Sequence, residues 1–510
     1  MKPIFRLLVA IAAIYLISIQ AFAAEDSQES DSGEASADVM PEPLFFESTH
    51  IIKIDGSALE YTATAATMVM KNDKDEPIAH FGYTAYTKQG ADKSSRPIMF
   101  AYNGGPGSAS MWLHMGILGP ERTQVEDTAF TTEGPFRRVS NDFSILDEAD
   151  LVMIDPVGTG FSRAVGKGKG TDFWGVDQDI ASVSDFIARY VTDNGRWQSP
   201  KFLLGESYGG IRSGGVAYYL LQRHSIALNG VILVSPYMDF VAGNAGLKID
   251  LPYVNFFTTY AATAWYHNAI ADRPDDLQVF LRQAEAFAYD EYAPILLKGN
   301  LASSEEREAV LAGMERFTGI SAEYWDKADL RIDESRFAKE LLREQRKTVG
   351  RIDSRFVGDG INHIGESFSY DPFFPAVGPA FVATFNDYYR EELGVKTDRR
   401  YVTSGQLWQH WEQGHDQPGA PYGKVPVANT AVDLAYSMVQ NPKMRVLVQQ
   451  GYYDLATPYG ATQYFINHMD VPKHILDNLE VEYYEAGHMM YLHEPSMGKF
   501  KQDLADFIAK

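Results

Sequence analysis

The stretch Gly205-Glu206-Ser207-Tyr208-Gly209-Gly210 is the most informative part of this chain for predicting its fold. It directly follows an apolar run, residues 202–204, and directly precedes residues 211–223, whose pattern predicts a helix. A Gly-x-Ser-x-Gly sequence between a strand and a helix makes a sharp turn that exposes the serine hydroxyl, and the flanking glycines permit that turn. Ser207 is therefore a candidate nucleophile. The alternative is a structural serine that caps the helix.

A second glycine cluster, Asn103-Gly104-Gly105-Pro106-Gly107, follows the predicted strand 97–102. Glycines after a strand let backbone N–H groups approach a ligand closely. When a serine turn lies downstream, such a loop supplies one N–H to a developing oxyanion, and the residue after the serine supplies the other. The alternative is a tight turn without a catalytic role.

Two polar residues near the C-terminus complete the pattern. Asp454 follows the apolar run 445–449, and His488 follows the alternating run 479–484, so both lie just past predicted strand ends. Open α/β sheets place their sites at such ends. The order serine, acid, histidine is that of α/β-hydrolases, which predicts this fold with Ser207, Asp454 and His488 as the triad. His493 is the rival histidine, but it lies farther from the strand end.

The motifs together resemble those of the serine carboxypeptidase family, which removes C-terminal amino acids. The supporting segments occur in the family's order between about residues 95 and 495; they are 103–108, Asp155-Pro156-Val157-Gly158-Thr159-Gly160-Phe161-Ser162, 205–210, Asp454 with Thr457-Pro458, and Gly487-His488-Met489.

The resemblance implies a role for each matching residue. Ser207 would be the nucleophile, His488 the base and Asp454 the group that orients it. The backbone N–H groups of Gly105 and Tyr208 would form the oxyanion hole. The terminal carboxylate of the substrate would be bound by Asn103, Gly104 and Glu206.

The sequence departs from the family at two points. Members usually carry a glutamate ahead of a Leu-Gly-Pro-like sequence, and here Ile117 stands ahead of Leu118-Gly119-Pro120. Without this partner carboxyl, burial alone would have to raise the pKa of Glu206, and a preference for acid to mildly acid conditions is expected to remain. Eukaryotic members also contain disulfide bonds, whereas this chain has no cysteine.

The patterns along the chain predict one large domain, residues 44–510. Alternating segments within 50–88 predict an antiparallel meander, and the later alternation of strands and helices predicts a mostly parallel sheet. Predicted strands lie near 97–102, 150–154, 201–204 and 229–235, with a helix over 174–191. From about 240 to 430 helical patterns dominate, at 275–297, 304–317, 334–347 and 381–393, which predicts a largely helical lid insertion. A helical domain of unrelated role is the alternative.

The first residues predict export. Residues 1–23 read as a cleavable signal peptide, because Lys2 and Arg6 precede an apolar stretch and Ala21-Phe22-Ala23 fits the cleavage rule. The polar, acidic residues 24–43 predict a disordered spacer. An uncleaved membrane anchor is the alternative, although the apolar run is short for one. Export without any cysteine indicates a bacterial periplasmic or secreted protein.

The composition limits the classes of ligand and partner that the chain can be expected to bind. The 510 residues are 45% hydrophobic, enough for a sizeable core, and carry a formal net charge of −23, which argues against nucleic-acid binding. The two histidines of 410–415 are five residues apart rather than the four of a zinc-binding helix, so no metal and no cofactor is expected.

The function predicted from these observations is a serine carboxypeptidase acting on peptides with a free C-terminus. The alternatives are another hydrolase of this fold (an esterase, an acyltransferase or an aminopeptidase) and a non-catalytic binding protein.

Overall fold

The computed structural model describes residues 41–245, 249–421 and 423–510. The predicted signal peptide, 1–23, and residues 24–40 of the predicted spacer lie outside the described residues.

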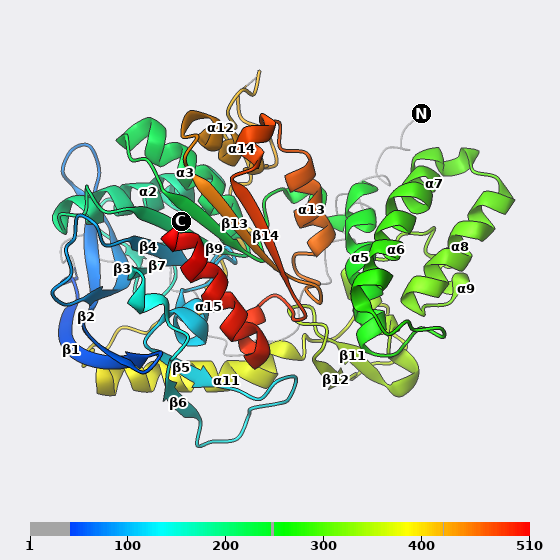
Figure 1. Ribbon diagram of the computed structural model, residues 1–510, viewed down its shortest axis with the longest axis horizontal. Helices are drawn as coiled ribbons and strands as arrows, with labels where there is room; N and C mark the ends of the chain where they lie inside the picture. Colours follow the sequence, from blue (N-terminus) through cyan, green and yellow to red (C-terminus); the bar gives the residue numbers. More distant parts are fainter. Residues whose placement is uncertain (1–40, 246–248, 422) are drawn as a thin grey trace, which may run out of the picture.

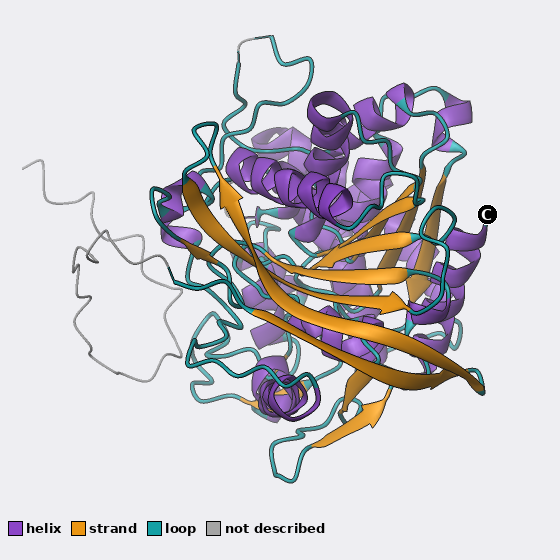
Figure 2. Ribbon diagram, turned by 90° about the vertical axis from the view of Figure 1, so that its left-hand side faces the viewer, coloured by secondary structure: helices purple, strands orange, loops and turns teal. Residues whose placement is uncertain are grey.

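A ten-stranded sheet organises the molecule (Figure 2). Its N-terminal strands form the antiparallel meander, and from β7 onward its neighbours pair in parallel. In spatial order the strands are β1 (Phe45–Ile54), β2 (Ser57–Lys71), β3 (Pro77–Lys88), β7 (Asp150–Asp155), β4 (Ile98–Tyr102), β9 (Lys201–Glu206), β10 (Gly230–Val234), β13 (Arg445–Gly451) and β14 (Leu479–Tyr484); β8 (Arg163–Ala164) pairs with β3. This order confirms the predicted fold class.

Helices cover both faces of the sheet because its central strands bury alternate side chains on opposite sides. On β4, for example, Met99 and Ala101 belong to one apolar cluster, whereas Ile98 and Phe100 belong to another. The first cluster includes α11 (Phe373–Asp387) and α15 (Glu494–Ala509). The second includes α2 (Val176–Asp193), α3 (Gly209–His224) and α12 (Ala431–Gln440).

Between β10 and β13 the chain leaves the sheet and builds a helical body, at the right of Figure 1. Its buried side chains form a third apolar cluster around Phe257 and Trp325. The elements are α4 (Phe240–Gly243), α5 (Leu251–Tyr266), α6 (Leu277–Phe287), the π-helical turn η5 (Ala288–Tyr292), α7 (Ala293–Lys298), η6 (Gly299–Leu301), α8 (Ser304–Thr318), α9 (Ala322–Lys327), α10 (Glu334–Glu340), η7 (Arg343–Gln345) and the pair β11 (Lys347–Val349) and β12 (Val357–Asp359). The chain then returns to the sheet through α11, η8 (Tyr388–Glu392), η9 (Trp408–His410) and α12.

The helix predicted over 304–317 is confirmed, and Ser303 caps α8 with Glu306 in a capping box. The helix predicted over 334–347 is wrong beyond residue 340, since the chain turns there and forms β11. The helix predicted over 381–393 begins eight residues earlier, at Phe373, and ends in a π-helical turn.

The remaining short elements border the sheet. They are α1 (Met111–Leu113), the π-helical turn η1 (His114–Leu118), the hairpin of β5 (Glu121–Gln124) and β6 (Arg137–Ser140), η2 (Ile145–Asp147), η3 (Gly170–Asp172), α13 (Tyr459–Asn467), α14 (Lys473–Leu476) and η10 (Met490–Leu492). No helix within the described residues combines the length and apolar character needed to cross a bilayer.

Candidate active site

Ser207 occupies a sharp turn between β9 and α3, as predicted. Its φ of 63° lies in the left-handed region, which a serine adopts only where its surroundings hold it there. Its N–H donates to Val234 O at 3.0 Å, and its carbonyl accepts from Gly210 N at 2.8 Å and Tyr237 N at 2.9 Å. The half-buried side chain makes no hydrogen bond within the described residues, which leaves the hydroxyl available to a substrate.

The glycine loop packs directly on this turn. A Cβ on Gly104 would lie 2.4 Å from Tyr208 N and 2.7 Å from Glu206 O, so only glycine allows the approach. The N–H groups of Gly105 and Tyr208 enter no hydrogen bond within the described part of the chain, as an oxyanion hole requires. Asp155 holds the segment that follows the loop, because its Oδ1 accepts from Ser110 N and Ser110 Oγ, both at 2.8 Å.

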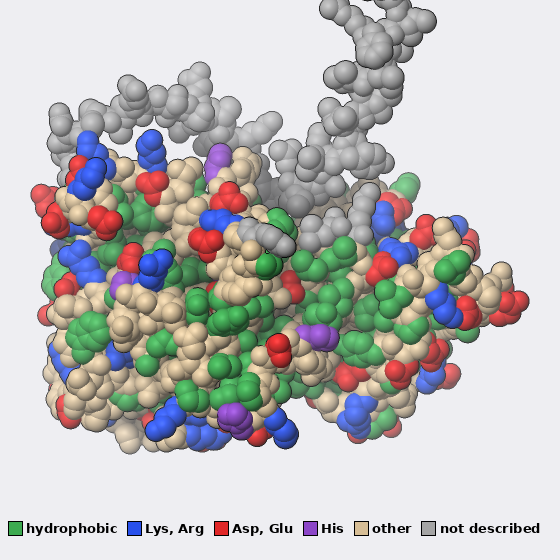
Figure 3. Space-filling view, turned by 90° about the horizontal axis from the view of Figure 1, so that it is seen from above, with side chains coloured by type: hydrophobic (Ala, Val, Ile, Leu, Met, Phe, Trp, Pro, Cys, Tyr) green, Lys and Arg blue, Asp and Glu red, His purple; other side chains and the backbone are tan. Residues whose placement is uncertain are grey.

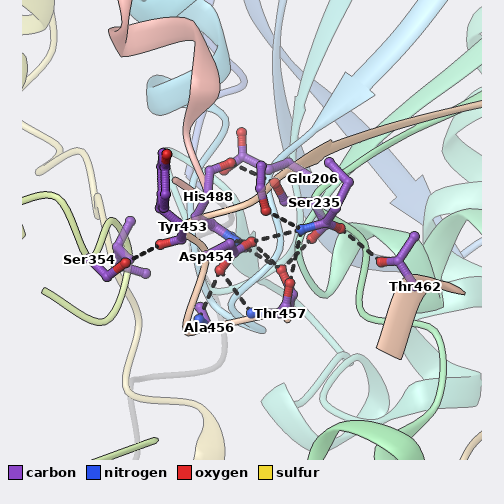
Figure 4. Close-up of polar contacts among 12 residues, drawn as sticks. Glu206, Ser235, Ser354, Tyr453, Asp454, Ala456, Thr457, Thr462 and His488 are labelled. Atoms are coloured by element: carbon purple, nitrogen blue, oxygen red, sulfur yellow. Dashed lines mark hydrogen bonds and ion pairs between the residues drawn. The ribbon is translucent and has the colours of Figure 1, made fainter. Parts of the chain in front are cut away.

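Asp454 and His488 meet at the ends of β13 and β14. His488 Nδ1 lies 2.7 Å from Asp454 Oδ2, and both side chains are buried (Figure 4). The remaining carboxylate lone pairs accept from Ala456 N at 2.8 Å and Thr457 N at 2.9 Å. Asp454 is therefore fixed as an acceptor that orients the imidazole.

Thr457 and Ser235 extend this network. Thr457 was quoted from the sequence as part of a family motif, without a role, and Ser235 was not singled out. Thr457 Oγ1 donates to Asp454 Oδ2 at 2.5 Å and lies 3.1 Å from His488 Nδ1. Ser235 Oγ donates to the carbonyl of His488 at 2.7 Å. Because Ser207 N bonds to the neighbouring Val234, the same segment positions both the serine turn and the histidine.

The rival histidine lies elsewhere. His493 precedes α15, where its Nδ1 contacts Ser496 Oγ at 2.8 Å. The structure therefore brings Asp454 together with His488.

The protonation of His488 is set by its neighbours. Burial lowers the pKa of His488, but the negative charge and hydrogen bond of Asp454, helped by the charge of Glu206, outweigh burial. The net result is a pKa above the usual range of histidine. Arg351, whose carbonyl accepts from Leu455 N at 3.1 Å, opposes this rise with its positive charge.

Glu206 is a buried carboxyl in the wall of the site, 4% exposed. Burial raises its pKa to about 7, although the charge of His488 and hydrogen bonds from Tyr491 and Asn103 act in the opposite direction. Asn103 Nδ2 donates to Glu206 Oε1 at 2.8 Å, and Leu113 N holds Asn103 Oδ1 at 3.1 Å. The three residues predicted to bind a carboxylate, Asn103, Gly104 and Glu206, thus lie together beside the serine turn.

Two groups that build this wall were not predicted from the sequence. Tyr491, on η10, donates from its hydroxyl to Glu206 Oε2 at 2.6 Å. Arg212, on α3, donates from Nη1 to the Asn103 carbonyl at 2.7 Å and from Nε to Asp179 at 2.7 Å. Arg212 lies two residues after the serine motif. The signal available in the sequence was its positive charge, which has no acidic residue beside it in the sequence and so called for a partner elsewhere in the fold.

No group of three or more side chains of the kinds that bind metals comes together within the described residues. The chemistry that these residues can perform is nucleophilic attack by Ser207 with acid–base assistance from His488.

Comparison with known proteins agrees with this geometry. Residues 70–278, which contain the glycine loop and the serine turn, match the family model described as serine carboxypeptidase. Serine carboxypeptidase-like 45 of Arabidopsis thaliana is 24% identical over 274 residues, covering 51% of this chain and 50% of that protein. The pheromone-processing carboxypeptidase KEX1 of Saccharomyces cerevisiae is 30% identical over 147 residues, 27% of this chain and 19% of that protein.

The chain thus spans about half the length of the first of these relatives, and less of the second. Among solved structures, a prohormone-processing carboxypeptidase of Saccharomyces cerevisiae, KEX1(Δ)P, superposes with a TM-score of 0.52 at 14% identity, covering 88% of this chain and 91% of that chain. At that identity the likeness establishes the α/β-hydrolase fold. Over the glycine loop and the serine turn, the chain is therefore similar to serine carboxypeptidases.

Proposed function

We propose that this protein is a serine-type carboxypeptidase that hydrolyses the C-terminal peptide bond of peptides. The observation that carries the proposal is the buried carboxyl of Glu206 beside the serine turn. A carboxyl with a pKa near 7 is protonated in mildly acid solution and can then donate a hydrogen bond to another carboxylate. The substrate for which such a donor is useful is a peptide with a free C-terminus.

The proposed reaction is peptide-bond hydrolysis through an acyl-enzyme on Ser207. His488 takes the proton of Ser207 Oγ as the oxygen attacks the last peptide carbonyl, and then gives that proton to the departing amino acid. Asp454 keeps the imidazole in the tautomer that can accept the proton. The N–H groups of Gly105 and Tyr208 stabilise the oxyanion, each contributing roughly 100- to 1,000-fold in rate. Water then hydrolyses the acyl-enzyme by the same route.

We expect the action to be confined to the chain end, because the terminal carboxylate would be bound one residue beyond the scissile bond. Asn103, Gly104 and Glu206 lie together beside the serine turn and offer an amide, a backbone N–H and a carboxyl to that carboxylate. An ionised Glu206 would repel the substrate, so binding requires one shared proton.

We further propose that the protein is a bacterial enzyme exported to the periplasm or the medium, with residues 1–23 removed. The basic start, the apolar stretch and the Ala21-Phe22-Ala23 site support this. N-terminal sequencing of exported protein should give Ala24 as the first residue. Membrane-bound material that retains Met1 or Lys2 would contradict the proposal.

Labelling and digestion test the activity. A fluorophosphonate should label Ser207, and the enzyme should cleave a peptide acid much faster than the matching C-terminal amide. Ser207→Ala should abolish both, since losing the nucleophile of such a triad costs on the order of a million-fold in turnover.

His488→Ala should lower the activity similarly severely, and His493→Ala should lower it only mildly. Equal cleavage of acid and amide would indicate another hydrolase, and the reverse order of the histidines would show that the base is His493.

The pH dependence tests Glu206 directly. Affinity for a peptide acid should fall as pH rises through about 7, because Glu206 then loses the proton that it shares with the substrate. Glu206→Gln should flatten this dependence, since an amide donates a hydrogen bond at every pH. An unchanged profile in Glu206→Gln would assign the dependence to another acidic group.

A further inference from the structure

Both oxygens of the Glu206 carboxyl are held by donors from different parts of the chain. Tyr491 OH lies 2.6 Å from Oε2, and Asn103 Nδ2 lies 2.8 Å from Oε1. We propose that Tyr491 is a positioning residue that takes the place of the glutamate that serine carboxypeptidases usually carry where this chain has Ile117, so that a single carboxyl, positioned by a phenol, recognises the substrate carboxylate. This inference deepens the proposed carboxypeptidase function and rests on it.

The packing of Tyr491 explains how a ring fits where a carboxyl is usual. The side chain is fully buried, and its ring lies against Gly116 on the π-helical turn η1. A Cβ on Gly116 would lie 2.4 Å from Tyr491 Cε2, so any other residue would displace the ring. Gly116 directly precedes Ile117, the position at which the family usually carries its glutamate. The ring thus occupies space beside the segment that would have supplied the missing carboxyl.

A phenol and a carboxyl differ in how readily they lose a proton. Two adjacent carboxyls share one proton because both cannot ionise together. Tyr491 keeps its own proton, since burial raises its pKa well above the usual range and the charge of Glu206 adds to the effect. One group of this pair therefore titrates, and it is Glu206.

The other charged groups that face Glu206 are members of the triad. His488, after β14, stabilises the ionised carboxyl, and Asp454, after β13, opposes its ionisation. These two groups remain in place when Tyr491 is changed, so an effect of Tyr491 can be separated from theirs. The hydroxyl of Tyr491 donates to the carboxylate and therefore favours the ionised form.

This chemistry fixes the sign of the effect of Tyr491→Phe. Without the donor, Glu206 keeps its proton to higher pH. The pH at which affinity for a peptide acid is lost should therefore rise, and above the original midpoint KM should fall by about tenfold for every pH unit by which the midpoint moves. Gly116→Ala, which displaces the ring and leaves the hydroxyl in the protein, should move the midpoint in the same direction. Damage from poor packing would instead lower activity at every pH and leave the midpoint where it was.

Infrared titration measures the proton on Glu206 without requiring any turnover. The carboxylic-acid C=O band present in the full-length protein and missing in Glu206→Gln belongs to Glu206. We expect this band to persist to higher pH in Tyr491→Phe than in the unsubstituted protein. Tyr292→Phe is the matched control, since Tyr292 is a buried tyrosine in the helical body whose hydroxyl donates to Leu330 O at 2.6 Å. It should leave the Glu206 titration unchanged.

The infrared titration and the kinetic measurement test the role of Tyr491 and the carboxypeptidase activity independently. A Glu206 band that titrates at the same pH in Tyr491→Phe and in the unsubstituted protein would overturn the role of Tyr491, whatever the enzyme cleaves. A shifted band in a protein that cleaves peptide acids and amides equally would support the tyrosine–carboxyl pair and overturn carboxypeptidase action. A shifted band with a matching change in KM for the peptide acid, and none for the amide, is the result that we expect.

Discussion

The raised pKa of Glu206 lowers the stability of the folded protein at neutral pH. Its unfolded pKa is 4.5 and its folded pKa is about 7, so between these values the unfolded chain has released a proton that the folded protein still holds. Stability that is complete below pH 4.5 therefore falls as pH rises and reaches its lower level above 7, a loss of about 3 kcal/mol.

Glu206→Gln should remove this loss, because an amide does not ionise and the Tyr491 hydroxyl can accept from it. The free energy of unfolding should exceed that of the unsubstituted protein at about pH 8 and match it at about pH 4. Denaturant unfolding at both pH values measures the difference. The control is Glu308→Gln on α8, an exposed carboxyl. An equal gain at both pH values would show that ionisation is not the cause.

At the scale of single residues, the positions that could be predicted from the sequence are those tied to strand ends. Ser207, Asp454 and His488 each follow a strand that the sequence pattern predicts. Because these strands are parallel, their ends lie at the same edge of the sheet. Tyr491 and Arg212 escaped prediction because their roles depend on contacts between segments far apart in the chain. Nothing near Tyr491 in sequence indicates that a glycine in η1 leaves room for its ring.

The glycine loop is the element on which the site depends most closely. It lies against the serine turn backbone to backbone, and a Cβ on Gly104 would clash with Tyr208 N and Glu206 O. Gly104→Ala should therefore push the loop away from the turn and lower kcat/KM by roughly 100-fold or more, the value of one oxyanion donor.

The matched control is Gly498→Ala on α15, where a Cβ meets no atom within 4 Å. Alanine in an exposed helix should raise stability by up to about 1 kcal/mol and leave activity intact. Steady-state kinetics and thermal melts measure both effects. Comparable activity in the two variants would show that the loop tolerates a side chain and that its approach to the turn is not required.

The elements that the sequence did not predict have physical reasons in common. Helix α5 is buried nearly all round, so it lacks the polar face that marks an amphipathic helix. The hairpin of β5 and β6 is short and polar, with no apolar run to reveal it. Strand β11 follows a helix so closely that residues 334–347 read as one continuous pattern.

For the whole molecule, the important observation is that the helical body and the sheet share a core at the active site. The apolar cluster of the helical body includes Tyr452, Tyr453 and Leu455, which flank Asp454. Ser354 N donates to Tyr453 O at 2.9 Å, and His488 N donates to Ile352 O at 2.8 Å. Apolar side chains also gather where the two parts meet on the face seen in Figure 3. The insertion therefore supports the triad loops as well as bordering the site.

This shared core predicts that the helical body and the triad lose their structure together. Met314 on α8 is fully buried in the helical body, and truncating such a side chain costs roughly 2–5 kcal/mol. In Met314→Ala, hydrogen exchange across α6 and α8 should rise at a lower temperature than in the unsubstituted protein. Fluorophosphonate labelling of Ser207 should be lost over that same lower range, because the packing that holds Asp454 is lost with the helices. Labelling that survives to the original temperature while the helices exchange freely would show instead that the insertion is an independent unit and that the triad loops need only the sheet.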